Sequence, residues 1–564
     1  MKVVIVGGVA GGATAAARIR RLDEQAEIVV FERTGYISYA NCGLPYYIGG
    51  VIADPEALTL QTPESFYTRF RVRMKVRHEV TALHPERKTV TVKNLETGEE
   101  FEESYDKLLL SPGARPAQPR LPGMGISRLF TLRTVEDTFR IKSYIDQAHP
   151  KSAVLAGGGF ISLELAENLR ELGMEVTIVQ QVGQLMEPFD PDMAAFLQSE
   201  MRRHGVKLAL GRTVDGFEET DGGVKVLLKE EASPLCADMV VLAIGVTPDT
   251  RLAGAAGLEL GVKGSIVVND RMETSAPDIY AVGDAVQVRN FVTGQDTVVA
   301  LAGPANKQGR IAADNICGGD SRYTGAQGSS ILKVFGMTAA LTGLNETQAR
   351  AAGLDADAVI LSPMSHAGYY PGGKVMTMKV VFETGTCRLL GAQIVGYEGV
   401  DKRIDVLAAA LRAGMKATEL KELELAYAPP YSSAKDPVNM AGFLIDNLAR
   451  GLLKQWRLEE AASLPQDGSV TLLDTRTAEE YAQGHIDGFF NLPVDELREH
   501  LDELDPGKPV YVICQSGLRS YIACRILSGH GFTCYNFSGG FRFYDAVTHE
   551  RVLTEKATAC GMDQ

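Results

Sequence analysis

The chain has 564 residues, too many for one hydrophobic core, and this length predicts three or four domains. An apolar fraction of 45% and a charged fraction of 23% are typical of soluble globular proteins. The formal net charge of −14 argues against nucleic acid or an anionic membrane as the main partner. No apolar stretch reaches the roughly 18 residues that a membrane-spanning helix needs. Eight scattered cysteines do not suggest a disulfide framework and favour a reducing, cytoplasmic location.

The first apolar run, at 2–6, is expected to be a buried strand rather than a signal peptide, because it leads straight into glycines without a cleavage site. The turn GGVAGG at 7–12 precedes an alanine-rich helix, and a second strand at 27–31 ends in Glu32. Such glycines let the backbone approach a pyrophosphate, and the acidic residue binds a ribose hydroxyl. Val9 stands where the motif has its middle glycine. An ordinary strand–helix turn is the alternative for this motif in isolation.

A second copy of the pattern begins with a predicted strand at 152–155. Three glycines follow at 157–159, Ser162 replaces the third glycine of the motif, and a strand at 176–179 ends in Gln180. Gln180 can bond a ribose 2′-hydroxyl but lacks the charge that repels a 2′-phosphate, and no arginine lies in QQVGQL to attract that phosphate. The second copy therefore favours NADH over NADPH.

Further along, the stretch TSAPDIYAVGDA predicts an apolar strand that ends at Asp284. Two dinucleotide folds and a late acidic turn, in this order, resemble the FAD- and NAD(P)H-dependent pyridine nucleotide–disulfide oxidoreductases over residues 1 to about 445. The resemblance implies that Asp284 bonds the ribityl chain of FAD. The cofactor-binding residues that it implies are Gly7, Gly8, Gly11, Gly12, Glu32, Arg33, Asn41, Gly113, Gly157, Gly159, Phe160, Ile161, Glu164, Gln180, Gly245, Asp284 and Ala302.

The stretch SYANCGLPYYIGG at 38–50 holds one cysteine, Cys42. Typical members of the family carry a C-x₄-C pair beside the flavin, but here Tyr47 follows at that spacing, so no such disulfide can form. A lone cysteine can pass electrons through a mixed disulfide with an external thiol, or through a sulfenic acid. We expect a helix N-terminus and the flavin to favour its thiolate. The alternative is a small buried apolar residue.

Several stretches, among them SYANCGLPYY, HAGYYPGG and LAYAPPY, resemble the coenzyme A disulfide reductases, which use one cysteine. The likeness implies that coenzyme A is the external thiol and that the protein is a homodimer. Tyr369 and Tyr427 match two tyrosines that reach the thiol from the opposite subunit, where a phenol can donate a proton to a leaving sulfur. On spacing alone, Arg18 and Arg21 are equally consistent with a solvated helix face. The positions that match contacts to coenzyme A are Thr14, Arg18, Arg21, Ser38, Asn41, Lys75, Asn306 and Lys435.

Near residue 445 this resemblance ends. After a helix predicted to continue through Trp456, the stretch EEAASLPQDG is typical of a linker. The stretch PVYVICQSGLRS then places Cys514 at the end of a buried strand, in a loop that leads into a helix. Backbone N–H groups of such a C-x₄-R loop stabilise an anionic persulfide on Cys514, and Arg519 closes the cradle. Together with DTR and GHI upstream, the loop resembles a rhodanese domain over about 465–555.

The predicted fold is therefore α/β, with two Rossmann-like dinucleotide-binding domains, an α+β dimerisation domain and a C-terminal α/β rhodanese domain. The expected boundaries are 1–150 and 271–324 for the FAD-binding domain, 151–270 for the NAD(P)H-binding domain, 325–445 for the dimerisation domain, 446–464 for the linker and 465–564 for the rhodanese domain.

The fusion of a thiol reductase to a sulfur-transfer site suggests that the substrate carries sulfane sulfur. We expect an NAD(P)H-dependent FAD enzyme that reduces coenzyme A persulfide, coenzyme A disulfide or polysulfide, and that releases thiol and sulfide. Two alternatives stay open: an NADH oxidase that works through a Cys42 sulfenic acid, and chiefly a rhodanese sulfurtransferase or sulfur carrier that the flavoprotein recharges. No metal, nucleic acid or membrane is expected as a partner.

Overall fold

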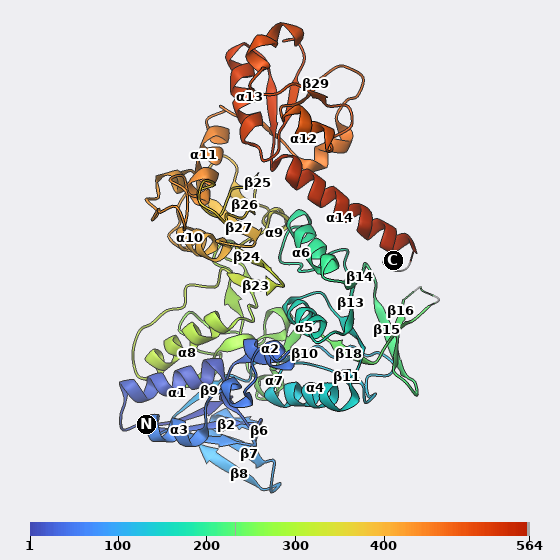
Figure 1. Ribbon diagram of the computed structural model, residues 1–564. Helices are drawn as coiled ribbons and strands as arrows, with labels where there is room; N and C mark the ends of the chain where they lie inside the picture. Colours follow the sequence, from blue (N-terminus) through green and yellow to red (C-terminus); the bar gives the residue numbers. More distant parts are fainter. Residues whose placement is uncertain (230, 232, 561–564) are drawn as a thin grey trace. The chain divides into compact units, whose positions relative to one another are not determined.

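The computed structural model describes residues 1–229, 231 and 233–560 (Figure 1). The chain forms two compact units, one of Met1–Gly183 with Gly205–Gly328, the other of Gln184–His204 with the chain from Ser329 onward. Both units are mixed α/β, which confirms the fold class predicted from the sequence. None of the helices in the described ranges combines the length and apolarity needed to cross a lipid bilayer.

The first unit contains a parallel five-stranded sheet whose strands come from two distant parts of the chain. Its order is β20-β9-β1-β2-β5, with β1 (Lys2–Val6), β2 (Glu27–Glu32), β5 (Arg73–Val76), β9 (Lys107–Leu110) and β20 (Ile279–Ala281). Most residues of β1 and β2 are buried, as expected for a parallel sheet covered on both faces. Helices α1 (Ala10–Leu22) and α8 (Ala302–Ile316) pack against each other. Because β1 and β2 run parallel, the glycine turn after β1 lies beside the end of β2.

A second parallel sheet in the same unit repeats this arrangement. Its order is β11-β18-β12-β13-β14, with β11 (Leu129–Phe130), β12 (Ser152–Ala156), β13 (Glu175–Gln180), β14 (Val206–Leu210) and β18 (Met239–Leu242). Helix α5 (Phe160–Glu171) follows β12 as α1 follows β1. Both strand–turn–helix–strand copies predicted from the sequence are therefore present.

Small antiparallel sheets and short helices complete the first unit. The sheets are β3 (Ile37–Tyr39) with β4 (Thr59–Gln61), β6 (His78–His84) with β7 (Thr89–Asn94) and β8 (Glu100–Ser104), β10 (Ala114–Pro116) with β19 (Val246–Pro248), β15 (Val214–Glu219) with β16 (Val224–Leu228) and β17 (Leu235–Ala237), and β21 (Val288–Arg289) with β22 (Asp296–Thr297). The helices are α2 (Leu44–Ile48), α3 (Pro63–Phe70), α4 (Val135–Ala148) and α7 (Arg251–Ala255). Strand β3 leads the chain into the turn that holds Cys42.

The second unit begins with an antiparallel five-stranded sheet. Its order is β23-β24-β27-β26-β25, with β23 (Ser330–Val334), β24 (Met337–Gly343), β25 (Ala356–Leu361), β26 (Met376–Glu383) and β27 (Leu389–Gly396). The helices in this part are α6 (Pro191–Arg203), α9 (Glu346–Ala351), α10 (Val400–Arg412) and α11 (Pro437–Ala449). Helix α6 follows β13 in the sequence but belongs to this unit, although its residues fall within the predicted NAD(P)H-binding segment.

A parallel sheet forms the C-terminal part of the second unit. Its order is β28-β32-β31-β29-β30, with β28 (Gln455–Trp456), β29 (Thr471–Asp474), β30 (Phe490–Asn491), β31 (Val510–Ile513) and β32 (Cys534–Phe537). The helices of this part are α12 (Ala478–Ala482), α13 (Leu518–Gly529) and α14 (Gly540–Cys560). Cys514 follows β31 directly and opens the loop into α13.

The prediction of a helix that continues through Trp456 is wrong. Helix α11 ends at Ala449, and Gly451 follows with a φ of 65°, a conformation that terminates helices. Trp456 instead lies in β28 within the predicted linker, and pairs with Phe537 of β32. Its side chain is fully buried, and the indole N–H donates a hydrogen bond to the Val512 carbonyl at 3.2 Å. Burial of this large ring therefore attaches the segment to the C-terminal sheet.

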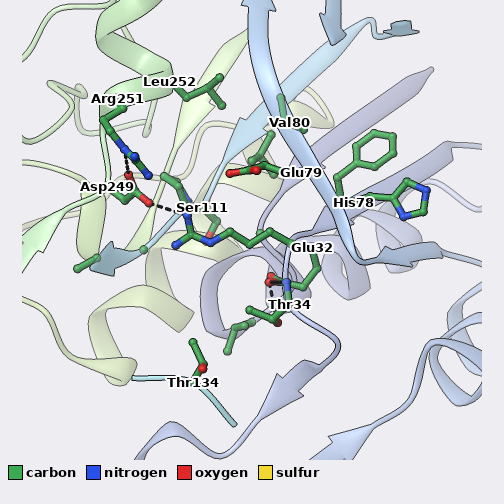
Figure 2. A pocket seen from close by; sticks show the side chains of 18 of the residues that line it. Glu32, Thr34, His78, Glu79, Val80, Ser111, Thr134, Asp249, Arg251 and Leu252 are labelled. Atoms are coloured by element: carbon green, nitrogen blue, oxygen red, sulfur yellow. Dashed lines mark hydrogen bonds and ion pairs between the residues drawn. The ribbon is translucent and has the colours of Figure 1, made fainter. Parts of the chain in front are cut away.

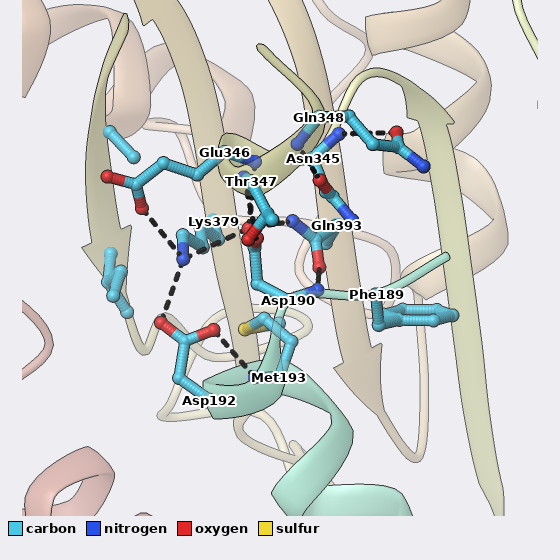
Figure 3. Close-up of polar contacts among 12 residues, drawn as sticks. Phe189, Asp190, Asp192, Met193, Asn345, Glu346, Thr347, Gln348, Lys379 and Gln393 are labelled. Atoms are coloured by element: carbon cyan, nitrogen blue, oxygen red, sulfur yellow. Dashed lines mark hydrogen bonds and ion pairs between the residues drawn. The ribbon is translucent and has the colours of Figure 1, made fainter. Parts of the chain in front are cut away.

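A buried ammonium joins three elements of the second unit (Figure 3). Lys379 of β26 is buried, and its Nζ lies 2.8 Å from Asp192 Oδ2, 3.1 Å from Asp190 Oδ2 and 3.0 Å from Glu346 Oε2. Asp190 and Asp192 stand at the N-terminus of α6, and Glu346 begins α9. Burial alone would lower the pKa of Lys379, but the three carboxylates raise it above its ordinary value. The cluster therefore fixes α6 and α9 to the antiparallel sheet.

Replacement of this ammonium should destabilise the second unit. Lys379→Met leaves carboxylates buried without their cation, and loss of one partner of a buried ion pair typically costs about 3–5 kcal/mol. Trp456 is the only tryptophan in the sequence, so its fluorescence reports unfolding of this unit in urea. We expect the midpoint of that transition to fall. Lys374→Met removes an exposed lysine of the same unit and should leave the midpoint nearly unchanged; equal shifts would contradict the role of the cluster.

Candidate active sites

The two glycine turns of the first unit are held by the same contact. The amide of Gly8 donates a hydrogen bond to Glu32 Oε2 at 2.8 Å, and the amide of Gly158 donates one to Gln180 Oε1 at 3.0 Å. Glu32 and Gln180 each end the second strand of their copy, and both are buried. The side chains predicted to bind a ribose therefore also fix the turn that receives a pyrophosphate.

The first glycine of the first turn is required by its backbone and surroundings. Gly7 has a φ of 97°, and a Cβ at this position would overlap the carbonyl oxygen of Ser111. A Cβ on Gly12 would overlap the carbonyl oxygen of Gly7. Val9, the exception to the motif, is the N-cap residue of α1, with a φ of −105° and a ψ of −139°. The valine thus replaces the middle glycine without breaking the strand–turn–helix path.

A cavity of about 460 Å³ opens beside the first turn (Figure 2). Asp249 lies at its wall between two arginines, 2.9 Å from Arg33 Nη1 and 3.2 Å from Arg251 Nε. Asn41 also lines the cavity, and its buried Oδ1 accepts no hydrogen bond from any described residue. A nucleotide cofactor would supply the missing donor and fill a space of this size, so these residues fit FAD. Other lining residues include Glu32, Thr34, His78, Ser111, Gly113 and Thr134.

Asp284 and Arg133 form an ion pair at the same site. Arg133 Nη2 lies 2.7 Å from Asp284 Oδ2, and Arg133 also lines the cavity. Asp284 was predicted to face the ribityl chain, but Arg133 was not predicted. No spacing in the stretch TLRTVEDT indicates that Arg133 would meet an aspartate some 150 residues later. The sequence-based site therefore lacked its principal cation.

Cys42 lies in a single helical turn, Asn41–Gly43, just before α2. It is an exposed residue whose thiol is nevertheless partly covered. Burial raises the pKa of Cys42, the carboxylates of Glu164 and Asp284 raise it further, and Arg133 opposes them. The expectation that a helix N-terminus favours the thiolate is therefore wrong for the protein's own groups. Helix α2 has only five residues, and burial of the thiol is the largest cause of the raised pKa.

Glu164 is the carboxylate of α5 that acts on Cys42. Burial raises the pKa of Glu164 to about 7, and the neighbouring Glu167 adds to the shift. The hydroxyl of Tyr46 donates a long hydrogen bond, 3.4 Å, to Glu164 Oε1. Its negative charge therefore appears near neutral pH, within reach of the thiol.

The predicted coenzyme A contacts are divided between the two units. Thr14 and Asn306 are hydrogen-bonded to each other between α1 and α8, and Arg18 Nε lies 2.7 Å from Asp314 Oδ1 on the same pair of helices. Lys75 lies 4.9 Å from the centre of the Phe101 ring. The structure thus brings Thr14, Arg18 and Asn306 together on one helix pair. Arg21 is exposed at the end of α1, Ser38 and Asn41 precede Cys42, and exposed Lys435 belongs to the second unit.

Tyr369 and Tyr427 form a pair on the surface of the second unit. Their hydroxyl oxygens are 2.7 Å apart, although the residues lie 58 positions apart in the sequence. The residues are 75% and 45% exposed. The mutual hydrogen bond raises the pKa of Tyr369. The two predicted tyrosines are therefore neighbours, and both are accessible to a partner.

The loop Cys514–Arg519 forms the second candidate site, which we call the cradle. Cys514 is fully buried, and its Sγ accepts hydrogen bonds from the Gly517 amide and the Ser520 hydroxyl, both at 3.2 Å. The guanidinium of Arg519 binds both oxygens of Glu480, at 2.6 and 2.7 Å. The predicted donors are therefore present, whereas Glu480 as the partner of Arg519 was not predicted. Among the described residues, no group of three or more His, Cys, Asp or Glu side chains is arranged to hold a metal ion.

The charge of Glu164 should control the reactivity of Cys42. Glu164→Gln removes a negative charge that opposes the thiolate, so Cys42 should react faster with iodoacetamide above about pH 7. Well below pH 7 Glu164 is already neutral, so the two proteins should react alike there. Peptide mass spectrometry over a pH series measures the rate at Cys42. Glu171→Gln, at the exposed end of the same helix, serves as the control, and an equal acceleration in it would refute the assignment.

Comparison with known proteins identifies the family of the chain and its domains. The sequence pattern of the pyridine nucleotide-disulphide oxidoreductases matches residues 1–309, that of their dimerisation domain matches 329–437, and that of rhodanese-like domains matches 457–546. A coenzyme A disulfide reductase of Staphylococcus aureus strain JH9 is 38% identical over 443 residues, which cover 78% of this chain and 99% of the relative.

Solved structures resemble the chain over most of its length. Reduced CoADR-RHD of Bacillus anthracis is 47% identical, with a TM-score of 0.95 and coverage of 98% of each chain. An NAD-dependent persulfide reductase from A. fulgidus is 37% identical, with a TM-score of 0.90 and coverage of 96% of this chain and 100% of the other. A water-forming NADH oxidase from Lactobacillus brevis is 29% identical, with a TM-score of 0.76 and coverage of 80% and 99%. The chain belongs to the pyridine nucleotide–disulfide oxidoreductases, enzymes that use FAD and NAD(P)H, and carries a rhodanese-like domain after its dimerisation domain.

Proposed function

We propose that the protein reduces persulfides or disulfides of coenzyme A, or polysulfide, with electrons from NADH. The observation that carries the proposal is that one chain has two separate cysteine sites. Cys42 lies near the cavity that fits FAD, and Cys514 lies in a loop whose N–H groups suit a persulfide. Tyr47 occupies the position of a second redox cysteine, so the sulfur that pairs with Cys42 comes from the substrate. The stretch QQVGQL that begins at Gln180 favours NADH because it contains no arginine to attract a 2′-phosphate.

The proposed chemistry at Cys42 balances with one electron pair. The Cys42 thiolate attacks the inner sulfur of a persulfide R–S–SH, a Cys42–S–S–R bond forms, and HS⁻ leaves. FAD held at the first glycine turn and Glu32 would supply an electron pair from NADH, the pair that reduction of this mixed disulfide needs. Cys42 and the R–S⁻ leaving group are then both thiolates, and R–S⁻ takes a proton. Because its own neighbours raise the pKa of Cys42, the protein itself favours the resting thiol.

Coenzyme A fits a set of polar residues in the unit that contains Cys42. Thr14 and Asn306 offer hydroxyl and amide groups on one helix pair, and Arg21 and Lys75 add cations suited to phosphates. Arg18 is already paired with Asp314, so it would have to exchange that partner to bind a phosphate. The name of the Staphylococcus aureus relatives, coenzyme A disulfide reductase, supports the same substrate class.

The tyrosine pair supports a homodimer with shared sites. Tyr369 and Tyr427 are exposed on the unit that contains the dimerisation domain, and neither lies in the unit that contains Cys42. Two-fold pairing would direct these hydroxyls of one subunit toward the leaving thiolate at Cys42 of the other. A phenol there offers a hydrogen bond as negative charge develops on sulfur.

A second candidate function is reduction of dioxygen through a Cys42 sulfenic acid. The likeness to the Lactobacillus brevis NADH oxidase and the lone, exposed Cys42 favour it. Oxygen consumption that matches NADH oxidation in the absence of any sulfur acceptor would establish this candidate. The cradle around Cys514 favours the sulfur substrate, since oxygen reduction has no use for it.

Two cysteine variants separate the two sites. Cys42→Ser should abolish NADH-dependent reduction of coenzyme A persulfide and disulfide while FAD stays bound, because Glu32 and the glycine turn do not depend on the thiol.

Cys514→Ala should abolish sulfur transfer from sulfane donors to cyanide but spare reduction of small free acceptors. Absorbance of NADH and of bound FAD measures the first, and thiocyanate formation the second. Wild-type reduction by the Cys42→Ser protein would end the proposal, and loss of both activities in Cys514→Ala would place the two sulfurs in series.

Tyr427→Phe should slow reduction of the sulfur substrate about ten- to hundredfold. A charge-assisted hydrogen bond to a leaving thiolate is worth about 1.5–3 kcal/mol, and this energy converts to such a rate factor. Stopped-flow reduction of the flavin by NADH should stay normal, because it precedes the step in which the thiol leaves. Tyr431→Phe, at a more exposed tyrosine four positions further along the chain, is the control and should have no effect.

Mixing Cys42→Ser subunits with Tyr427→Phe subunits tests whether the site is shared. If the tyrosine acts across the interface, the mixed dimer has both lesions in one site and none in the other. Activity should then rise above that of either parent, with about half of the sites restored. If no activity returns after subunit exchange is proven by mass spectrometry, Tyr427 serves its own chain and the shared site is refuted.

A further inference from the structure

The cradle around Cys514 is electrically balanced by carboxylates. Both terminal nitrogens of Arg519 bind Glu480, at 2.6 and 2.7 Å. The second arginine near the loop, Arg476, donates to Gln515 at 3.4 Å and is bound by Asp474 at 2.7 Å. Arg476 and Asp474 are fully buried, whereas Arg519 and Glu480 are about one-third exposed. The two arginines whose side chains the structure shows bonded at or beside the loop, Arg519 and Arg476, therefore each have their own anion.

Of the two acids, Glu480 and Asp474, only Glu480 pairs with an arginine that solvent reaches. It lies in α12, after the capping residue Thr477, and its carboxylate accepts from the Thr477 amide as well. The hydrogen bonds from Arg519 lower the pKa of Glu480 to about 2, so the acid stays ionised at every working pH. Arg519 is close enough to interact with the charge of Cys514, which helps to raise the arginine pKa. Glu480 thus sets the net charge that a donor meets at this cysteine.

We propose that Glu480 makes the cradle selective for persulfides of low charge over dianionic donors such as thiosulfate. The inference rests on the proposed role of Cys514 as an acceptor of sulfane sulfur. A cradle with an unpaired arginine would attract a dianion more strongly than a monoanion, and pairing with Glu480 removes most of that difference. Leu518, next to Arg519, is 64% exposed and presents an apolar side chain rather than another cation at the loop.

The two transfers differ by one unit of charge on the donor. With a persulfide, the Cys514 thiolate attacks the outer sulfur of R–S–S⁻, the sulfur–sulfur bond breaks, and R–S⁻ leaves as a thiol after it takes a proton from water. With thiosulfate, the same attack on the outer sulfur releases sulfite, which carries two negative charges. In both cases one neutral sulfur atom moves from the donor to the Cys514 thiolate, so the transfer needs no external oxidant or reductant. Both transfers leave the same persulfide on Cys514, so the hydrogen bonds from Gly517 and Ser520 do not distinguish the two donors.

The test is the ratio of two specificity constants in the full-length FAD-bound protein. Sulfur transfer to cyanide is measured as thiocyanate, with thiosulfate or the persulfide of 2-mercaptoethanol as donor. Glu480→Gln keeps a hydrogen-bond acceptor for Arg519 but removes the charge. We expect it to raise kcat/KM for thiosulfate relative to the persulfide about tenfold. Glu479→Gln removes an exposed charge from the neighbouring position and should leave the ratio unchanged.

A second measurement reports the charge at Cys514 without sulfur transfer. Iodoacetate and iodoacetamide differ by one negative charge, so the ratio of their rates at the Cys514 peptide should rise in Glu480→Gln and stay constant in Glu479→Gln. If Glu480→Gln lowers transfer from both donors equally and leaves the alkylation ratio unchanged, Glu480 only positions Arg519 and the inference is overturned. If the wild-type protein transfers sulfur from neither donor, the proposed role of Cys514 fails, and this inference fails with it.

Discussion

One buried ammonium determines how the second unit is assembled. Lys379 neutralises acids from α6 and α9, elements that lie far apart in the sequence. Three carboxylates around one cation leave an excess of negative charge, which Arg457 reduces by an ion pair with Glu346. Arg457 directly follows β28, the strand that attaches the C-terminal sheet. Charge balance at Lys379 thus links the antiparallel sheet to the start of the rhodanese-like part.

The first unit depends on a contact that occurs twice. In each dinucleotide fold, the last residue of the second strand accepts a hydrogen bond from a glycine amide in the turn. The geometry is the same, but the charge is not, because Glu32 is an acid and Gln180 an amide. Glutamate and glutamine therefore hold the glycine turn in the same way, and the difference between them lies in the charge that a ligand meets. An amide retains the acceptor for a ribose hydroxyl and drops the repulsion of a phosphate.

Local motifs were predictable from the sequence, and long-range partners were not. The loop at Cys514 depends on residues within a few positions, and the turns at Gly8 and Gly158 depend on acceptors 24 and 22 positions later, at the end of the next strand of the motif, so spacing indicated them. Arg133, Glu480 and the acids around Lys379 act through partners brought close only by folding, and no spacing marks them. The raised pKa of Cys42 has in part the same origin, since Glu164 and Asp284, which add to the effect of burial, lie far along the chain. The helix expected through Trp456 failed because burial of its ring overrides local helix propensity.

The two cysteines have different polar neighbours, and under the proposed function this contrast suits two different tasks. Cys42 lies near carboxylates that oppose its thiolate, so it accumulates negative charge only when a bound group compensates for them. Cys514 receives two hydrogen bonds from its own loop, so it can hold an anionic sulfur without a ligand. A cysteine that reacts in each catalytic cycle benefits from staying a thiol between cycles, because a free thiolate is readily oxidised. A residue that stores sulfane sulfur needs lasting stabilisation instead. Under the proposed function, the hydrogen bonds at Cys514 suit storage of sulfane sulfur, and the carboxylates near Cys42 suit a thiol that reacts only during turnover.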